Sequence, residues 1–132
     1  MSEGHFERLD AAECVNVLGD AAIGRVAFEG PDGLTVIPLA FRLDGDRVVL
    51  RTAEGTRLAA LSDDTPVAFE VDEFDAEAAN GWSVLVRGVI NRLPDESLDE
   101  GRTPRPYVPG ERRVLLSISM DEISGRAVSA AE

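Results

Sequence analysis

Hydrophobic residues follow a helical spacing near the start of this chain and a strand spacing over most of the rest. Over residues 10–20 the apolar positions form one helix face. Asp10 stands at the N-cap position and Glu13 follows three residues later, as in a capping box. From Ile23 the hydrophobic residues alternate with a period of two, which indicates strands.

The period of two predicts six strands, and turn residues separate them. Gly30-Pro31-Asp32-Gly33 and Asp44-Gly45-Asp46 are hairpin signals. A short helix is expected at 56–61, a loop at 72–80 and an irregular segment at 94–110, and the tail after Arg126 is weakly specified. The expected strands are 23–28, 34–43, 47–52, 66–72, 82–91 and 114–120. Six antiparallel strands with two small helices predict a mainly β barrel or sandwich, in one domain over residues 1–132.

One of these strands carries an unusual residue. The segment 34–43 is apolar at successive positions, which predicts burial on both faces, yet Pro38 lies in its middle. Because proline has no backbone N–H to donate, this strand must contain a bulge or have one edge without a partner strand at that point. A ligand could occupy such an edge.

The composition excludes several classes of function. A net charge of −12 opposes binding to nucleic acids and to anionic membranes. The single cysteine, Cys14, excludes an intrachain disulfide and a multi-cysteine zinc site. His5 is the only histidine, so no metal site is expected. Neither a signal peptide nor an apolar stretch long enough to span a bilayer is present, and the expected location is the cytoplasm.

Candidate chemistry concentrates in the segment 51–58. It joins a strand end, a glycine turn and an expected helix start, and it carries two hydroxyls and two guanidiniums, on Arg51, Thr52, Thr56 and Arg57. A helix N-terminus and a forked guanidinium both suit a phosphate group. The alternative is structural: Thr56 caps the helix, and the two arginines pair with Glu54 or Glu70 on the surface.

The run 48–61, Val-Val-Leu-Arg-Thr-Ala-Glu-Gly-Thr-Arg-Leu-Ala-Ala-Leu, resembles the cofactor-phosphate segment of the pyridoxamine 5′-phosphate oxidase-like flavoproteins. The segments 23–28, 36–39, 67–72 and 81–88 are similar to core strands of the same family, so the resemblance covers most of residues 9–126. It implies a six-stranded antiparallel split β-barrel with small flanking helices, which dimerises and binds flavin mononucleotide (FMN) in two clefts between the subunits.

The resemblance also implies roles for particular residues. The phosphate would be held by Arg51, Thr52, Thr56 and Arg57. The isoalloxazine ring would be bordered by Val36, Ile37 and Pro38, and the partner subunit would supply Trp82 and Ser83. Trp82 serving only as part of the barrel core is an equally supported alternative. No catalytic side chain is identified.

The chain departs from the family pattern at two places. Many relatives have a lysine in the helix-start pair, where this sequence has Arg57 followed by Leu58. The oxidase itself binds its vitamin substrate with an arginine-rich C-terminal segment. This sequence has no counterpart of that segment after Arg126. Pyridoxamine phosphate oxidation is therefore not expected, and the resemblance is closest to short actinobacterial-type members similar to nitroimidazole-resistance proteins.

Three functions follow from this resemblance. The first is an FMN-dependent oxidoreductase acting on a small molecule, with the flavin carrying the chemistry. The second is a reductase of the same fold that uses the deazaflavin F420. The third is a non-catalytic dimer that binds flavin, or nothing, and acts through its surface.

Overall fold

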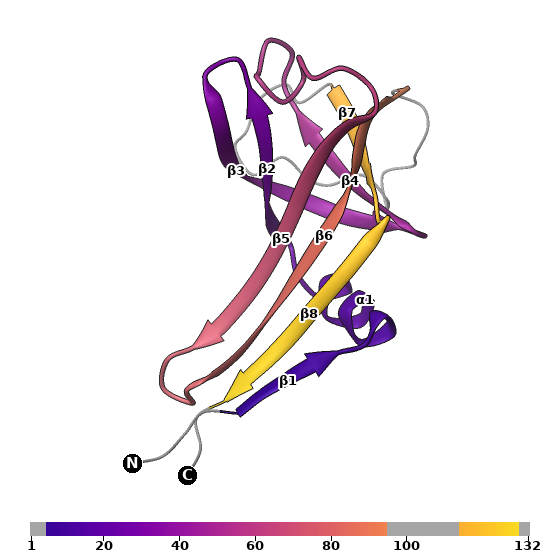
Figure 1. The fold of residues 1–132 in the computed structure, drawn as a ribbon. Coiled ribbons are helices and arrows are strands. Elements are labelled where there is room, and N and C mark those ends of the chain that lie inside the picture. The colour runs from indigo at the N-terminus through magenta and orange to yellow at the C-terminus, as the bar shows by residue number, and fades with distance from the viewer. Residues whose placement is uncertain (1–4, 95–113, 130–132) are drawn as a thin grey trace.

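The computed structural model of the chain describes residues 5–94 and 114–129. Within these residues the fold consists of one helix and a single antiparallel sheet (Figure 1). The elements, in chain order, are β1 (His5–Leu9), α1 (Ala11–Gly19), β2 (Ile23–Gly30), β3 (Gly33–Asp44), β4 (Arg47–Thr52), β5 (Thr65–Asp75), β6 (Asn80–Leu93), β7 (Val114–Ser119) and β8 (Glu122–Ser129).

The sheet closes into a barrel because β6 has two different neighbours along one edge. The strand order is β1-β8-β6-β5-β2-β3-β4-β7, and β6 also pairs with β7. The first half of β6, residues 80–87, pairs with β8, whereas residues 90–93 pair with β7. Strands β2 to β7 therefore form a closed six-stranded barrel, from which the long β5–β6 hairpin, β8 and β1 extend (Figure 1). The predicted six-stranded split barrel is confirmed.

Side chains that alternate along each barrel strand fill its interior. Phe69 of β5 is fully buried and meets Phe41 of β3 edge to face, with ring centroids 4.9 Å apart. The alternate positions of β5 and β6 that face the interior are buried; they are Val67, Phe69, Val71, Val84, Val86 and Ile90. In β7, by contrast, every residue from Val114 to Ile118 is buried, so the expected polar outer face is absent there.

The helix begins where the sequence predicts. The Asp10 carboxylate accepts from the Glu13 backbone N–H at 2.8 Å, and the Glu13 carboxylate accepts from the Asp10 N–H at 2.9 Å, which completes the capping box. Cys14 and Leu18 are the buried residues of the helix, and Cys14 lies against Gly125 of β8. Burial and the nearby acidic side chains raise the pKa of the Cys14 thiol, which keeps it protonated. In the described part of the chain no helix has the length and apolar character that a membrane span requires.

Three sequence predictions about secondary structure were wrong. Strands β1 and β8 were not predicted, because none of their described side chains is buried and their hydrophobic alternation is therefore weak. The acidic segment 72–80 is mostly strand: β5 runs to Asp75 and β6 resumes at Asn80 in direct register with it. Residues 56–61 form successive turns rather than a helix, so α1 is the one helix among residues 5–94 and 114–129. The predicted irregular segment at 94–110 lies almost entirely outside the described residues.

Candidate functional site

One edge of β3 has no partner strand over the segment that contains Pro38. On one side β3 pairs with β2 along residues 33–40, and Pro38 lies opposite Arg25. On the other side its pairing with β4 starts only at Phe41. Among the described strands, none therefore covers that edge from Leu34 to Ala40, and the missing proline N–H costs no ladder bond there. This confirms the predicted unpaired edge.

The prediction that this strand is buried on both faces was wrong in its first half. Leu34 is 86% exposed and Val36 is 62% exposed, and Pro38 on the same face is also exposed. Ile37 points to the other face and packs against the core. The strand thus presents an apolar outer face next to an open backbone edge, and large exposed apolar patches of this kind mark binding surfaces.

The turn after β4 brings two of the predicted phosphate-binding hydroxyls together. The hydroxyls of Thr52 and Thr56 are 3.2 Å apart, and Thr52 is only 2% exposed. The Thr56 hydroxyl also donates to the Ala53 carbonyl at 3.0 Å and accepts from the Ala59 N–H at 3.1 Å. Thr56 therefore stabilises a turn, whereas the structural alternative predicted that it caps a helix. Because 56–61 is not a helix, a helix N-terminus does not contribute to phosphate binding here.

The two arginines of this turn have partners in the chain. Arg57 forms an ion pair of 2.7 Å with Asp32, which lies in the β2–β3 turn, and both side chains are about 60% exposed. The pairing joins the tip of the β2–β3 hairpin to the turn after β4. Arg51 at the end of β4 is also engaged within the chain. Neither of the predicted partners, Glu54 or Glu70, pairs with Arg57; Glu54 pairs with Arg92 and Glu70 with Arg25.

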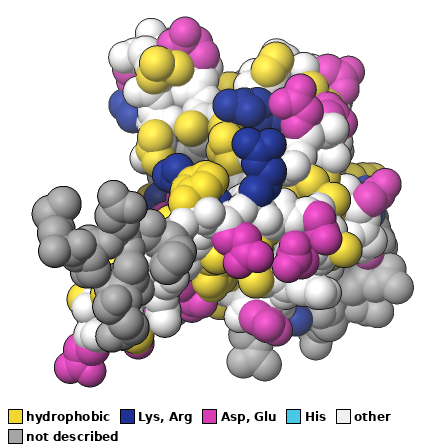
Figure 2. All heavy atoms as spheres, turned by 60° about the horizontal axis from the view of Figure 1, so that its bottom comes forward, with side chains coloured by type: hydrophobic (Ala, Val, Ile, Leu, Met, Phe, Trp, Pro, Cys, Tyr) yellow, Lys and Arg dark blue, Asp and Glu magenta, His cyan; other side chains and the backbone are white. Residues whose placement is uncertain are grey.

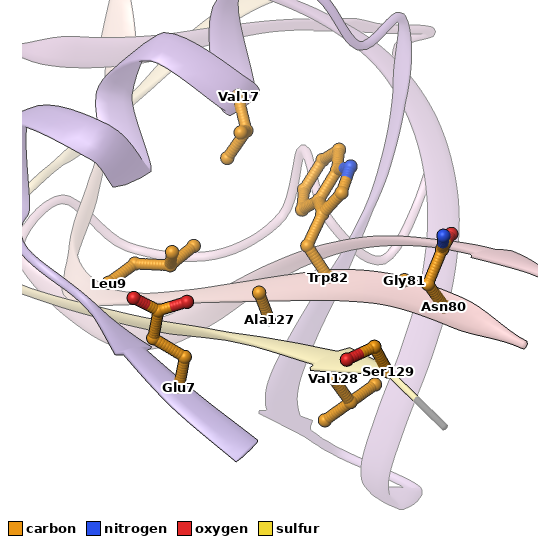
Figure 3. Close-up of a pocket in the computed structure, with 9 residues that line it drawn as sticks. All are labelled: Glu7, Leu9, Val17, Asn80, Gly81, Trp82, Ala127, Val128 and Ser129. Carbon is orange, nitrogen blue, oxygen red and sulfur yellow. The ribbon is translucent and has the colours of Figure 1, made fainter. Parts of the chain in front are cut away.

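Trp82 and Ser83 point to opposite faces of the sheet, because adjacent residues in a strand alternate. The Trp82 indole lies on the helix side, where it packs against the core and borders a cavity of about 350 Å³ together with Leu9 and Val17 (Figure 3). Ser83 lies on the outer face, which Val36 and Pro38 share across the paired strands. Of Trp82 and Ser83, only Ser83 shares a face with the exposed part of β3 in the same chain.

The register separates Trp82 from the arginines of the turn. Leu93 at the end of β6 pairs with Leu115, which in turn pairs with Arg51. Trp82 lies eleven residues earlier in β6, which corresponds to roughly 35 Å along the strand at about 3.3 Å per residue. One chain therefore cannot place Trp82 and Arg51 on the same small ligand. Both can contact one ligand only if Trp82 belongs to a second copy.

An ion-pair network on the outer face was not predicted from the sequence. Arg25 of β2 reaches the carboxylates of Glu70 and Asp72, both at 2.9 Å. Burial raises the pKa of the Glu70 carboxyl above its usual value, and the hydrogen bond and negative charge of Asp72 raise it further, while Arg25 opposes the rise. The three side chains meet because β2 and β5 pair at Arg25 and Glu70.

This network predicts a pH dependence of stability. A carboxyl whose pKa is raised on folding binds its proton more tightly in the native state, so the contribution of Glu70 to stability falls as pH rises from about 4.5 through the raised value. Glu70→Gln removes that loss. We expect the free energy of unfolding of Glu70→Gln, relative to wild type, to increase between about pH 4 and pH 8 in urea titrations. Glu73→Gln, an exposed change on the same strand, is the control; an equal trend in both variants would contradict the assignment to Glu70.

A second cavity, of about 640 Å³, lies on this outer face beside β1, β8 and β6. It is bordered by Ser83 and by arginines of β1 and β8, Arg8 and Arg126. This cavity was not predicted from the sequence, because β1 and β8 were not predicted. Figure 2 shows that basic side chains gather near the middle of one face of this acidic molecule, while acidic side chains are scattered around them.

Comparison with known proteins matches the chain to one protein family. The family model described as pyridoxamine 5′-phosphate oxidase matches residues 10–127. No curated protein matches the chain. A solved structure from Corynebacterium glutamicum, named as a candidate pyridoxamine 5′-phosphate oxidase, superposes with a TM-score of 0.79 at 26% identity and covers 96% of each chain.

Two further solved structures show the same fold. The FAD-binding protein from Mycobacterium smegmatis superposes with a TM-score of 0.72 at 29% identity, covering 93% of this chain and 98% of that one. A protein from Bacteroides thetaiotaomicron, named for 5-nitroimidazole antibiotic resistance, superposes with a TM-score of 0.68 at 14% identity, covering 100% of this chain and 95% of that one. At that identity the third comparison shows the fold alone.

Proposed function

This chain belongs to the pyridoxamine 5′-phosphate oxidase family, and we propose from this premise that it binds FMN between two copies of itself and is an oxidoreductase of a small molecule. The observation that carries the proposal is the open edge of β3 at Pro38, which lies beside an exposed apolar face. A flat ring with polar edges fits such a place, because it can contact the apolar side chains and hydrogen-bond to backbone groups. When bound, the flavin would supply hydride transfer.

The turn after β4 supplies the proposed phosphate contacts. Arg57 is held by Asp32 through an exposed ion pair, and pairs of this kind contribute at most about 1 kcal/mol. A phosphate can therefore displace Asp32, since its hydrogen bonds with a guanidinium are charge-assisted and bidentate. Arg51 is the second proposed contact. Thr52 and Thr56 act mainly by stabilising the turn, because their hydroxyls already bond to each other.

The positions of Trp82 and Ser83 support the proposed homodimer. They lie too far along β6 to reach a ligand held by Arg51 of the same chain, so we assign them to the cofactor bound by the partner. Because the two side chains point to opposite faces, only one of them can contact a given cofactor through its side chain. Ser83 is the proposed contact: it lies on the outer face of its own subunit, and Val36 and Pro38, which would border the ring, lie on the outer face of the other subunit.

FAD is the second candidate cofactor, because the Mycobacterium smegmatis structure is named as an FAD-binding protein. The deazaflavin F420 and a non-catalytic flavin-binding dimer are further outcomes that the same experiment resolves. Purified protein is examined by absorbance and mass spectrometry for a bound ligand, then stripped and titrated with FMN, FAD and F420 by fluorescence. Tightest binding of FMN, together with dimers in light scattering, supports the proposal. Absence of flavin binding contradicts it, and bound flavin that is never reduced or reoxidised supports the non-catalytic dimer.

Substitutions of Arg57 and of its partner Asp32 are expected to change the FMN affinity in opposite directions. Arg57→Gln removes a charge-assisted hydrogen bond, which is worth about 1.5–3 kcal/mol, and we expect FMN binding to weaken at least tenfold. Asp32→Asn removes the competing carboxylate, and we expect binding to tighten several-fold. Arg47→Gln is the control, because Arg47 lies at the other end of β4 and pairs with Asp44 at 2.9 Å. Isothermal titration measures all three; equal affinities for wild type and Arg57→Gln would remove Arg57 from the site.

A further inference from the structure

Two arginines on the extension of the sheet face each other across adjacent strands. Arg8 of β1 and Arg126 of β8 are direct partners in the antiparallel register, so their side chains lie on the same face. That face is the outer one, because Arg126 in turn pairs with Ser83 of β6. Like charges placed directly opposite each other in a sheet are destabilising. The fold therefore contains a destabilising contact between Arg8 and Arg126.

The charge balance of the chain makes this contact unexpected. The sequence has 25 acidic residues and 13 basic ones. The other arginines in the described residues are engaged: five form ion pairs with carboxylates, and Arg42 and Arg51 also interact within the chain. Arg8 and Arg126 have no carboxylate partner among the described residues. In the described part of this acidic chain, these two guanidiniums therefore lie without a carboxylate beside them.

The arginines border a cavity suited to a ligand. The cavity has a volume of about 640 Å³, and its lining combines both arginines with the hydroxyls of Ser83 and Ser124 and the apolar side chains of Phe6 and Leu85. The Arg126 guanidinium lies over the Phe6 ring, 5.4 Å from its centroid, a contact that helps to hold the arginine in position. Glu70 also borders the cavity, but Arg25 pairs with its carboxylate at 2.9 Å.

We infer that Arg8 and Arg126 form a binding site for an anionic group, a phosphate or carboxylate, on a ligand with an apolar body. An anion between the two guanidiniums would attract both of them, which would offset their mutual repulsion. It would also accept several charge-assisted hydrogen bonds. The site lies on the same face as Ser83 and Pro38. Its assignment to the substrate of the oxidoreductase rests on the proposed function, whereas anion binding itself does not. A second phosphate of a longer cofactor such as FAD has the same chemistry.

The first test measures anion binding without any flavin. Flavin-free protein is titrated with inorganic phosphate and with benzoate at constant ionic strength, and binding is followed by the NMR signals of the arginine side chains. We expect saturable shifts in wild type and at least tenfold weaker binding in Arg126→Gln. Arg87→Gln is the matched control, because Arg87 lies on the same face and pairs with Glu122 at 3.7 Å. Binding of equal strength in wild type and Arg126→Gln overturns the inference, as does no saturable binding in wild type.

A charge reversal separates anion binding from folding. In Arg8→Glu, the new carboxylate faces Arg126 directly, so we expect a higher midpoint of thermal unfolding than in wild type and complete loss of phosphate binding. A variant that unfolds at lower temperature than wild type, or that still binds phosphate, contradicts the inference. Because this variant is expected to gain stability, loss of binding cannot be attributed to loss of the fold.

Flavin titrations with Arg8→Glu identify the source of the anionic group. If FMN and FAD bind as in wild type, the site serves the substrate. If FAD binding weakens at least tenfold while FMN binding is unchanged, the site serves the second phosphate of the cofactor; both results support an anion site. If the wild-type protein binds phosphate but binds no flavin, the proposed function fails while the anion site stands.

Discussion

Phe69→Ala is expected to lower the free energy of unfolding by about 3–5 kcal/mol, the range for truncating a buried phenylalanine. The Phe69 ring is fully buried at the centre of the barrel and packs edge to face on Phe41. It also fills the space over Gly24 of β2, where a Cβ atom would overlap the ring. Truncation therefore leaves a cavity that the rigid barrel cannot close. Urea unfolding followed by circular dichroism measures the change.

Phe74→Ala is the matched control for this prediction. Phe74 lies five residues further along the same strand and is 65% exposed, so its truncation is expected to change stability by less than about 0.5 kcal/mol in the monomer. An equal loss of unfolding free energy in the two variants would contradict the prediction that burial of the Phe69 ring in the barrel stabilises the fold.

Gly88→Ala is expected to prevent proper closure of the barrel and to cost about 3 kcal/mol, the upper range for overpacking. Gly88 lies in β6 between the segment that pairs with β8 and the segment that pairs with β7. A Cβ atom there would overlap the Ser119 carbonyl oxygen at the end of β7. The adjacent Val89 N–H donates to the Ser119 hydroxyl at 3.0 Å, and this bond would be disturbed as well.

Gly19→Ala provides the comparison for this second prediction. A Cβ atom at Gly19 meets nothing within 4 Å, and the residue ends α1, so alanine is expected to leave stability unchanged or slightly raised. The midpoints of thermal unfolding of Gly88→Ala and Gly19→Ala, compared with wild type, test this prediction. Gly88→Ala with a wild-type midpoint would mean that β6 and β7 do not approach as closely as the structure shows.

Local features of the sequence predicted several parts of this molecule correctly. Asp10 and Glu13 form the expected capping box because capping depends only on residues three apart in the chain. The strands around Phe69 follow from strict alternation, and the unpaired edge at Pro38 follows from the chemistry of proline. The family resemblance was also confirmed, since it rests on an ordered series of such segments.

Other parts depended on contacts between distant residues. A helix was predicted at 56–61, but Thr56 instead closes a turn through contacts with Thr52, Ala53 and Ala59. The partner of Arg57 is Asp32, which is 25 positions away and reaches it only because the β2–β3 hairpin folds beside the turn. Long-range charge pairs of this kind have no signal in local spacing.

The sequence by itself determined the six strands of the barrel, the capped helix and the positions at which an arginine-bearing turn and a proline-containing strand occur. Their physical causes act within a few residues of the chain: side-chain alternation, capping hydrogen bonds and the missing proline N–H. Only the tertiary structure decided that β6 splits its edge between β7 and β8, that Trp82 and Arg51 lie far apart, and that Arg8 faces Arg126. Those relations depend on strand register, which is set by packing across the whole barrel.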